Sequence, residues 1–442
     1  MDILFSNVTV VTMDEAMHVL VSAHVGVTGT KISYVGKDAP KEKPEKIIDG
    51  TGMVLMPGLI NCHTHLAMSL LRGAAEDCGP GQWLDEFVFP RTDRMDARSA
   101  KAGVLLGLAE CLRFGVTSVS DLYAFPEVTA EAVAEVGMKA NIAAPLALFT
   151  DESEEFDFER DPQCKKLRED VRKWNGYDDG RIRMECGLQA EYTGNYRLWE
   201  PLSAYAAEEG LRIQLHLAET KAEHENCLDR TGLTQTQLLD CHHLLDVPVT
   251  AAGCVALEPE DMALLGKRKA TAVYCPVSNM KFGLPVAPVI DMVKNGMNVT
   301  LGTDSAASNN NLDLFEEMKA AALAAKVKSG DASAMPAAAV LMMATACGAR
   351  AQGREAECGM IKVGMDADLC LVDFTAPHLM PTHNVLTSLV YSARGGDVAM
   401  TMVRGKILYA AGKFPTIDLG AVVQEMAEYA IDRVFNPTQD QQ

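Results

Sequence analysis

The stretch Pro57-Gly58-Leu59-Ile60-Asn61-Cys62-His63-Thr64-His65 contains the strongest structural signal in the sequence. Its apolar residues predict a buried strand, and the strand ends in two histidines that are separated by one residue. Because side chains alternate between the two faces of a strand, His63 and His65 point to the same side. Two neutral imidazoles on one side can hold a single metal ion, and zinc and iron both suit them. On its own, such a pair is a weak metal signal.

Two further strand ends carry residues of the same kind. Leu215-His216-Leu217-Ala218-Glu219-Thr220 ends an apolar run with a histidine and a carboxylate, and Leu301-Gly302-Thr303-Asp304-Ser305-Ala306 ends another with an acid. In a parallel barrel the carboxyl ends of the strands converge. Three imidazoles and one carboxylate with a position left for water describe a catalytic metal site. The alternative is that His216 and Asp304 only form hydrogen bonds within the core.

The middle of the chain alternates apolar runs with helical patterns such as those at Ser99–Phe114 and Asn311–Lys328. This alternation predicts an α/β protein built on a parallel (β/α)8 barrel. The expected strands are Gly58–Cys62, Val116–Val119, Lys139–Ala143, Ile182–Gly187, Arg212–His216, Val249–Val255, Ala270–Tyr274 and Asn298–Leu301.

Both ends of the chain have a different character, with short strands broken by turns. With 442 residues, the chain exceeds the roughly 250–300 residues at which a single core stops growing. We therefore expect residues 1–56 and 365–442 to combine into a small composite β-sandwich, with a C-terminal helix. Residues 57–364 would form the barrel.

Composition and charge exclude several classes of protein. A formal net charge of −20 without a basic cluster argues against binding to nucleic acids and to anionic membranes. The N-terminus lacks a signal-peptide pattern, and the apolar tract Met335–Ala346 is shorter than a membrane span. We therefore predict a cytoplasmic protein whose 12 cysteines are reduced.

One acidic segment, Asp151–Asp161, follows the third expected strand. It is either a solvated loop or a lid that selects a cationic substrate, because loops at this end of a barrel surround the active site.

Taken together, these motifs give a specific resemblance that covers nearly the whole chain. The sequence resembles the amidohydrolase superfamily, within it the branch of S-adenosylhomocysteine and 5′-methylthioadenosine deaminases with the related triazine hydrolases. The motifs that carry it are PGLINCHTH, Trp83-Leu84, HLAET, CPVSNMKFG and LGTDSAASNN, in that order.

The resemblance implies a mononuclear divalent metal site in a (β/α)8 barrel. The metal would be zinc, with iron as the alternative, held by His63, His65, His216 and Asp304. Asp304 would accept a proton from the metal-activated water, and Glu219 would transfer one to a ring nitrogen of the substrate. The relatives also suggest a homo-oligomer that acts on a small molecule.

The sequence departs from the family pattern at three positions near the expected pocket. Gly253 stands where the family has a histidine that orients the attacking water, and Gln189 replaces another histidine. Thr92 stands where an acidic residue often contacts the ribose of the substrate, whereas Ser308 is retained. Removal of the imidazole at Gly253 is expected to leave room for a larger group or a water molecule. The predicted substrate-binding residues are Trp83, Thr92, Gln189, Glu219, Gly253 and Ser308.

The sequence therefore predicts a metal-dependent aminohydrolase of a nitrogen heterocycle, with a pocket altered from adenosine-type substrates. Glu219 and Asp304 are the predicted catalytic residues. Two alternatives remain open at this point. The same metal site could hydrolyse a cyclic amide or remove a chloro or thio group from a heteroaromatic ring, or the protein could bind a metal or ligand with little turnover.

Overall fold

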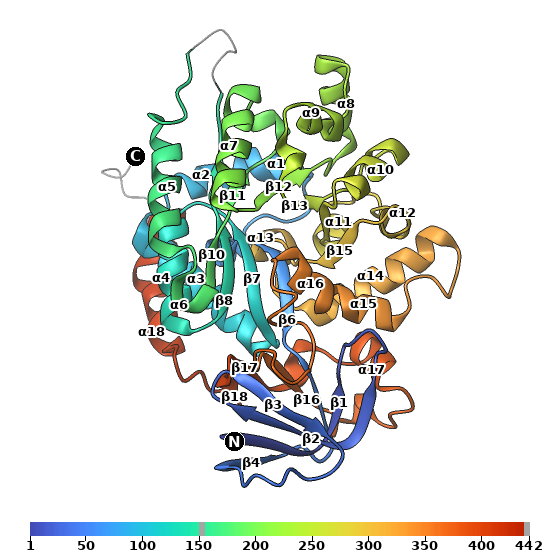
Figure 1. Ribbon diagram of the computed structural model, residues 1–442. Coiled ribbons are helices and arrows are strands. Elements are labelled where there is room, and N and C mark those ends of the chain that lie inside the picture. Colours follow the sequence, from blue (N-terminus) through green and yellow to red (C-terminus); the bar gives the residue numbers. More distant parts are fainter. Residues whose placement is uncertain (150–154, 437–442) are drawn as a thin grey trace.

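The apolar runs in the middle of the chain form parallel strands surrounded by helices in the computed structural model, which describes residues 1–149 and 155–436 (Figure 1). The strands are β6 (Leu59–Thr64), β7 (Val116–Leu122), β8 (Lys139–Ala143), β9 (Pro145–Leu146), β10 (Ile182–Met184), β11 (Cys186–Leu188), β12 (Ile213–Leu217), β13 (Val249–Gly253), β14 (Thr271–Tyr274) and β15 (Asn298–Leu301).

These strands form two parallel sheets that together make a ring. The orders are β10-β8-β7-β6 and β15-β14-β13-β12-β11-β9. Only Ala144 separates β8 from β9 and only Glu185 separates β10 from β11, so these two pairs each occupy one barrel position and connect the sheets. A parallel bridge between Thr64 and Asp304 joins β6 to the chain after β15. The predicted (β/α)8 barrel is confirmed, except that the fourth expected strand is interrupted at Glu185.

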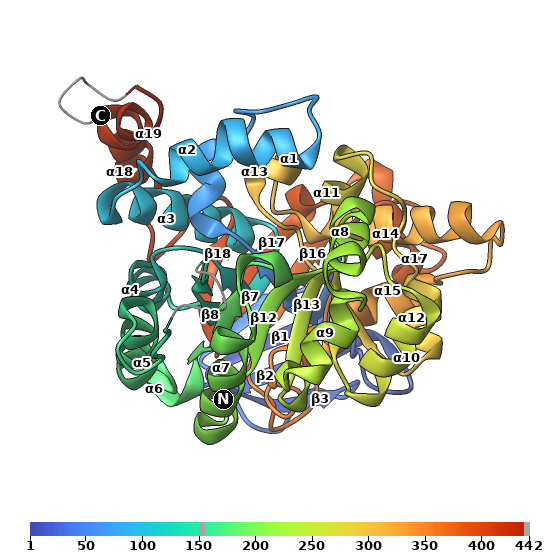
Figure 2. The same ribbon diagram turned by 90° about the horizontal axis from the view of Figure 1, so that it is seen from above.

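Helices follow the strands and cover the barrel on its outside (Figure 2). Their hydrophobic faces pack on the strands, and capping side chains fix where many of them begin; the Asp96 carboxylate, for example, accepts the Ser99 amide at 2.9 Å. The helices before the C-terminal sheet strands are α1 (Pro80–Gln82), α2 (Phe89–Thr92), α3 (Ala97–Arg113), α4 (Pro126–Val136), α5 (Pro162–Trp174), α6 (Tyr177–Gly180), α7 (Tyr196–Glu209), α8 (Lys221–Thr231), α9 (Gln235–Cys241), α10 (Pro259–Lys267), α11 (Pro276–Lys281), α12 (Val289–Lys294), α13 (Ala306–Asn309), α14 (Leu314–Ser329), α15 (Ala337–Met343) and α16 (Ala346–Ala351).

The two ends of the chain meet in one mainly antiparallel sheet below the barrel (Figure 1). Its order is β18-β17-β16-β5-β1-β2-β3, with β4 paired to β1, and the two ends join where Leu371 faces Leu55. The strands are β1 (Ile3–Val11), β2 (Val19–Thr28), β3 (Lys31–Gly36), β4 (Lys46–Asp49), β5 (Met53–Pro57), β16 (Leu369–Asp373), β17 (Val398–Val403) and β18 (Lys406–Ala410). This arrangement confirms the composite β unit.

The helices of the C-terminal part pack on the barrel. They are α17 (Val385–Tyr391), α18 (Leu419–Glu425) and α19 (Ile431–Phe435), and α18 lies against α3 (Figure 2). The division of the chain at residues 57 and 364 remains a prediction.

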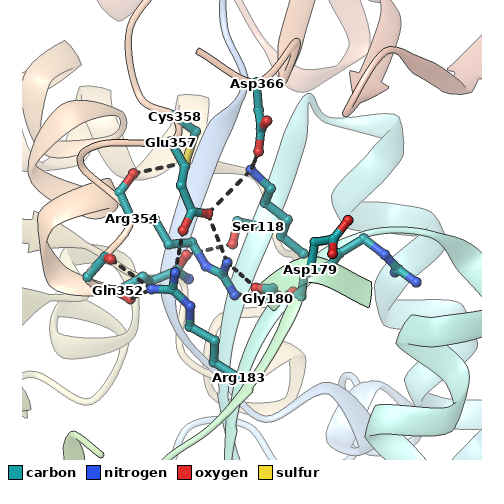
Figure 3. A network of polar contacts seen from close by, with 12 residues as sticks. Ser118, Asp179, Gly180, Arg183, Gln352, Arg354, Glu357, Cys358 and Asp366 are labelled. Atoms are coloured by element: carbon teal, nitrogen blue, oxygen red, sulfur yellow. Dashed lines mark hydrogen bonds and ion pairs between the residues drawn. The ribbon is translucent and has the colours of Figure 1, made fainter. Parts of the chain in front are cut away.

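A buried polar network closes the N-terminal end of the barrel (Figure 3). The fully buried guanidinium of Arg354 donates to the Ala140 carbonyl at 3.1 Å and to the Gly180 carbonyl at 2.6 Å. Lys139 Nζ, at the start of β8, lies 2.7 Å from Asp366 and 2.6 Å from Asp368, which precede the sheet strand β16. The network therefore also connects the barrel to the terminal sheet.

None of the helices in the described ranges is long and apolar enough to cross a membrane.

Candidate active site

The four predicted metal ligands come together at the C-terminal end of the barrel. His63 lies in β6 and His216 in β12. His65 directly follows β6, and Asp304 lies three residues beyond the end of β15. His63 Nε2 is 3.1 Å from His216 Nε2, and His65 Nε2 is 3.1 Å from Asp304 Oδ1. The three buried histidines offer ligand nitrogens that all lie within 4.8 Å of one another. The barrel thus brings residues from three distant parts of the sequence to one point.

Backbone carbonyls orient two of the imidazoles. Nδ1 of His65 donates to the Leu122 carbonyl, and Nδ1 of His216 donates to the Gln189 carbonyl at 2.7 Å. A protonated Nδ1 leaves the lone pair on Nε2, which faces the shared point. Burial and the neighbouring imidazoles lower the pKa of His216 to about 3, so its ring is neutral. A neutral imidazole is the form that binds a metal ion.

Two serines hold the carboxylate of Asp304. Its Oδ2 accepts hydrogen bonds from Ser278 Oγ at 2.7 Å and Ser308 Oγ at 2.6 Å, so Oδ1 faces the imidazoles. Burial raises the pKa of Asp304, but the hydrogen bonds with His63 and His65 outweigh burial and hold this pKa well below its usual range. The side chain is therefore an anion with one oxygen available to a cation.

The loop that carries His65 is fixed by Asp121 at the end of β7. One carboxylate oxygen accepts the Leu66 amide at 2.7 Å and the Thr64 hydroxyl at 3.1 Å. Sequence reasoning missed Asp121 and Ser278. The first is an acid near the end of a barrel strand, and the second lies within the CPVSNMKFG motif, so both carried a signal.

The donor set fits one divalent ion. Two imidazole nitrogens 3.1 Å apart, each able to present a lone pair, need a proton or a cation between them. Three imidazoles and one carboxylate oxygen that converge from one side provide four ligands and leave the cavity side open to water. The chemistry of these residues therefore supports a divalent metal site.

A cavity of about 180 Å³ opens beside the predicted ligands. Glu219 lies in its wall, and burial, together with the charges of Asp304 and Glu223, raises the pKa of Glu219 to about 8. The residues that line the cavity are His65, Met68, Pro80, Trp83, Leu84, Val88, Phe89, Thr92, Tyr123, Ala124, Pro145, Gln189, Tyr192, His216, Glu219, Glu223, Phe282 and Asp304.

Four of the six predicted substrate-binding residues line this cavity: Trp83, Thr92, Gln189 and Glu219. Trp83 and Phe282 pack edge to face, with ring centroids 5.2 Å apart. Sequence reasoning missed four further residues of the lining. Phe282 lies within the CPVSNMKFG motif and so carried a signal, whereas no motif marks Tyr123, Tyr192 or Glu223.

Ser308 and Gly253 lie outside the cavity lining. Ser308 is fully buried behind Asp304, so its position suits holding that carboxylate. Gly253 has a φ of +91°, and a Cβ there would lie 3.1 Å from Glu219 Cβ and 3.3 Å from the Leu217 carbonyl oxygen. The open space expected beside Gly253 is therefore absent from the described structure, because Glu219 packs against this glycine.

Residues 151–154 of the acidic segment lie outside the described residues. Its described part, residues 155–161, packs beside α7, where Phe158 contacts the ring of Tyr205, and none of these seven residues lines the cavity.

Comparisons with known proteins show the family of the chain. The model of the amidohydrolase family matches residues 54–408. A 5-methylthioadenosine/S-adenosylhomocysteine deaminase of Moorella thermoacetica is 39% identical over 91% of this chain and 94% of its own length. A 5′-deoxyadenosine deaminase of Methanosarcina acetivorans is also 39% identical, over 96% of both chains. The crystal structure of an adenosine deaminase from Xanthomonas campestris with bound zinc has a TM-score of 0.91 and 31% identity, and the match covers 98% of each chain.

The fold and the site define a barrel hydrolase with a divalent metal centre at the C-terminal ends of its strands. The chain belongs to the amidohydrolase family, and it is an enzyme of the type that hydrolyses carbon–nitrogen bonds other than peptide bonds. The resemblance seen in the sequence is confirmed.

Proposed function

We propose that the protein deaminates a nitrogen heterocycle hydrolytically, with one zinc ion held by His63, His65, His216 and Asp304. The observation that carries the proposal is the convergence of three buried imidazoles and an anchored carboxylate beside a cavity whose wall contains a protonatable Glu219. The deaminase names of the relatives favour deamination over the cleavage of another bond, and the zinc in the Xanthomonas structure favours zinc over iron.

The residues of the site supply a complete path for the protons. A divalent ion, when bound here, supplies the Lewis acidity that makes water a nucleophile near neutral pH. Asp304 Oδ1 accepts one proton of the attacking water, and Glu219 donates its proton to the ring nitrogen beside the attacked carbon. Asp304 then gives its proton to the leaving amine, and Glu219 recovers one from the new hydroxyl group. Ammonia and a ring carbonyl are the products.

Gln189, Thr92 and Trp83 would position the substrate. None of them is charged, and Thr92 Oγ lies 2.6 Å from the Tyr123 hydroxyl, so it is already engaged with the protein. The pocket is therefore proposed to differ from that of the adenosine-type relatives. A homo-oligomer remains a prediction.

The test combines metal analysis with an assay for ammonia. The purified full chain is expected to contain about one zinc per protein, and it should release ammonia from at least one aminoheterocycle. The His63→Ala and His216→Ala variants should lose both the metal and the activity. A chain that binds zinc but releases no ammonia from a broad panel of purines, pyrimidines and triazines would contradict the proposal.

A further inference from the structure

The active-site cavity is small, and its described lining carries three acidic side chains but neither lysine nor arginine. Its volume of about 180 Å³ is well below the roughly 300–1,000 Å³ of cavities that hold drug-sized ligands. A flat heteroaromatic base fills such a space, whereas a nucleoside adds a sugar of similar size.

The position that often contacts the ribose in the family carries the uncharged Thr92 here. The hydroxyl of Thr92 is engaged with Tyr123 at 2.6 Å. The described lining includes neither lysine nor arginine, so a carboxylate or a phosphate on the substrate would lack a counter-charge. The wall is instead formed by Trp83, Phe282 and other aromatic rings, which bind the face of a planar ring.

Glu223 is the one acidic group of the wall that the proposed mechanism does not use. It lies in the first turn of α8, where Thr220 Oγ accepts its amide at 3.1 Å, so its backbone is fixed. Burial raises the pKa of Glu223 in spite of hydrogen bonds with Thr220 and with the Glu219 backbone. The carboxyl group therefore folds back beside Glu219.

No cation of the described structure pairs with Glu223. Arg230, which lies on the same helix, forms its ion pair with Glu191. Tyr192, another residue of the wall, has its pKa raised by burial and by Glu223, Glu219, Glu191 and Asp85. The wall around Glu223 therefore presents hydrogen-bond acceptors to a ligand. A carboxyl group that is mostly removed from water is stabilised when a ligand donates hydrogen bonds to it.

We infer that the substrate is a sugar-free heteroaromatic base with two amino groups, and that Glu223 is a specificity-determining residue that accepts hydrogen bonds from the second one. The first amino group leaves as ammonia, and the ring nitrogen served by Glu219 lies between the two. Because Glu223 folds back beside Glu219, its carboxyl group can reach the neighbouring ring substituent. This inference rests on the proposed function and narrows its substrate class.

The experiment compares matched compounds on the zinc-loaded full chain. The probes are 2,6-diaminopurine, adenine and adenosine, which differ stepwise by one amino group and one sugar. We expect kcat/KM for ammonia release to be about 10–100-fold higher for 2,6-diaminopurine than for adenine, as a charged hydrogen bond of roughly 1.5–3 kcal/mol implies. Adenosine should be the poorest of the three.

The Glu223→Gln variant should remove most of this preference. It is expected to raise KM for 2,6-diaminopurine at little cost in kcat, and to change KM for adenine by less than about threefold, because the lost contact concerns binding of one substituent. Glu225→Gln is the matched control, since Glu225 is exposed on the same helix and pairs with Lys221 at 3.0 Å. The control should leave both substrates unchanged.

Several results would overturn the inference. One is a kcat/KM for adenosine as high as that for adenine. Another is the absence of a preference for 2,6-diaminopurine over adenine. A third is a Glu223→Gln variant that loses kcat/KM equally on both bases. Calorimetric dissociation constants keep the test independent of turnover. If 2,6-diaminopurine binds best in a Glu223-dependent way but no compound releases ammonia, the proposed function fails, and only the role of Glu223 in binding a second amino group stands. If ammonia is released only from adenosine, the function stands and the inference fails.

Discussion

Gly253 shows how one backbone conformation can support a catalytic side chain. Its φ of +91° is favourable only for glycine, and the missing Cβ lets Glu219 pack against it. An imidazole at this position would require a different backbone as well as a different side chain. Restoring the histidine of the family pattern is therefore no simple reversal.

Gly253→Ala should both destabilise the protein and reduce its activity. Left-handed strain and the 3.1 Å contact with Glu219 Cβ are expected to lower the free energy of unfolding by about 2–3 kcal/mol and to move Glu219 away from the substrate. Gly330→Ala is the control, because Gly330 has a φ of +63° with open space around its Cβ position, and it should lose only about 1 kcal/mol. Chemical denaturation and the ammonia assay measure the two effects. Equal losses in both variants would show that contact with Glu219 is unimportant.

Glu219→Gln should separate metal binding from catalysis. The amide has the shape of the carboxyl group but cannot release and recover a proton, so kcat is expected to fall by about 10²–10⁴. The zinc content should stay at one per chain, because Glu219 is not among the proposed ligands. A variant that retains more than a tenth of wild-type kcat would exclude Glu219 as the proton donor.

At the level of elements, α11 and α13 act on the site through Asp304. Each helix presents one serine hydroxyl to Oδ2, Ser278 from α11 and Ser308 from α13. A residue that hydrogen-bonds to a metal-binding side chain fixes the orientation of that side chain. Its loss typically lowers metal affinity or activity by about 10–100-fold.

Ser308→Ala should therefore weaken zinc binding by about 10–100-fold, as measured by competition with a chelator. Ser329→Ala is the control, because Ser329 donates at 2.8 Å to the Ala325 carbonyl at the far end of α14. Its zinc affinity should equal that of the wild type. If Ser308→Ala also binds zinc normally and loses activity only through a higher KM, Ser308 acts on the substrate, as the sequence had suggested.

The strands and the residues proposed as metal ligands could be recognised in the sequence because each signal lies within one short stretch. Lys139–Ala143 and Asn298–Leu301 are short runs in which polar and apolar residues alternate, and their predicted limits agree with those of β8 and β15. His63 and His65 follow from the alternation of a strand. Glu185 interrupts the fourth strand, and no apolar pattern marks this position.

The cavity wall could not be derived in the same way. Trp83 and Phe282 are about two hundred residues apart, yet their rings pack together at 5.2 Å. Contacts of this kind depend on how loops fold over the barrel. The repeat of hydrophobic residues every two positions in a strand, or every 3.6 in a helix, does not reveal how a loop folds. The expected space at Gly253 was wrong for a related reason, because a sequence shows a missing side chain but not the neighbour that fills its place.

Over the whole molecule, Lys139 connects the barrel to the terminal sheet. Its ammonium group lies between Asp366 and Asp368, 227 and 229 residues further along the chain. Lys139→Ala would leave two buried carboxylates without their main partner, so the free energy of unfolding should fall by about 3–5 kcal/mol. Lys294→Ala, which removes an exposed pair with Asp291, should cost less than about 1 kcal/mol. Similar losses in the two variants, measured by chemical denaturation, would show that the buried pair adds little.

The same contact makes stability depend on pH in a defined direction. Burial raises the pKa of Asp366, but Lys139 and Lys31 outweigh burial and lower it below its ordinary value. For a carboxyl group with a lowered pKa, the folded state binds fewer protons than the unfolded state. The stabilisation is therefore complete above the ordinary pKa of about 3.9 and is lost as the pH falls through the lower folded value.

Asp366→Asn should remove this dependence. The variant is expected to unfold at lower denaturant concentration than the wild type at pH 7, and the difference should shrink steadily between pH 5 and pH 3, because the wild-type carboxylate loses its ion pairs as it is protonated. Asp38→Asn, at an exposed position of the same part of the chain, should leave the wild-type profile unchanged. A difference that stays constant down to pH 3 would mean that Asp366 stabilises the protein through packing, and the connection between sheet and barrel would then be independent of charge.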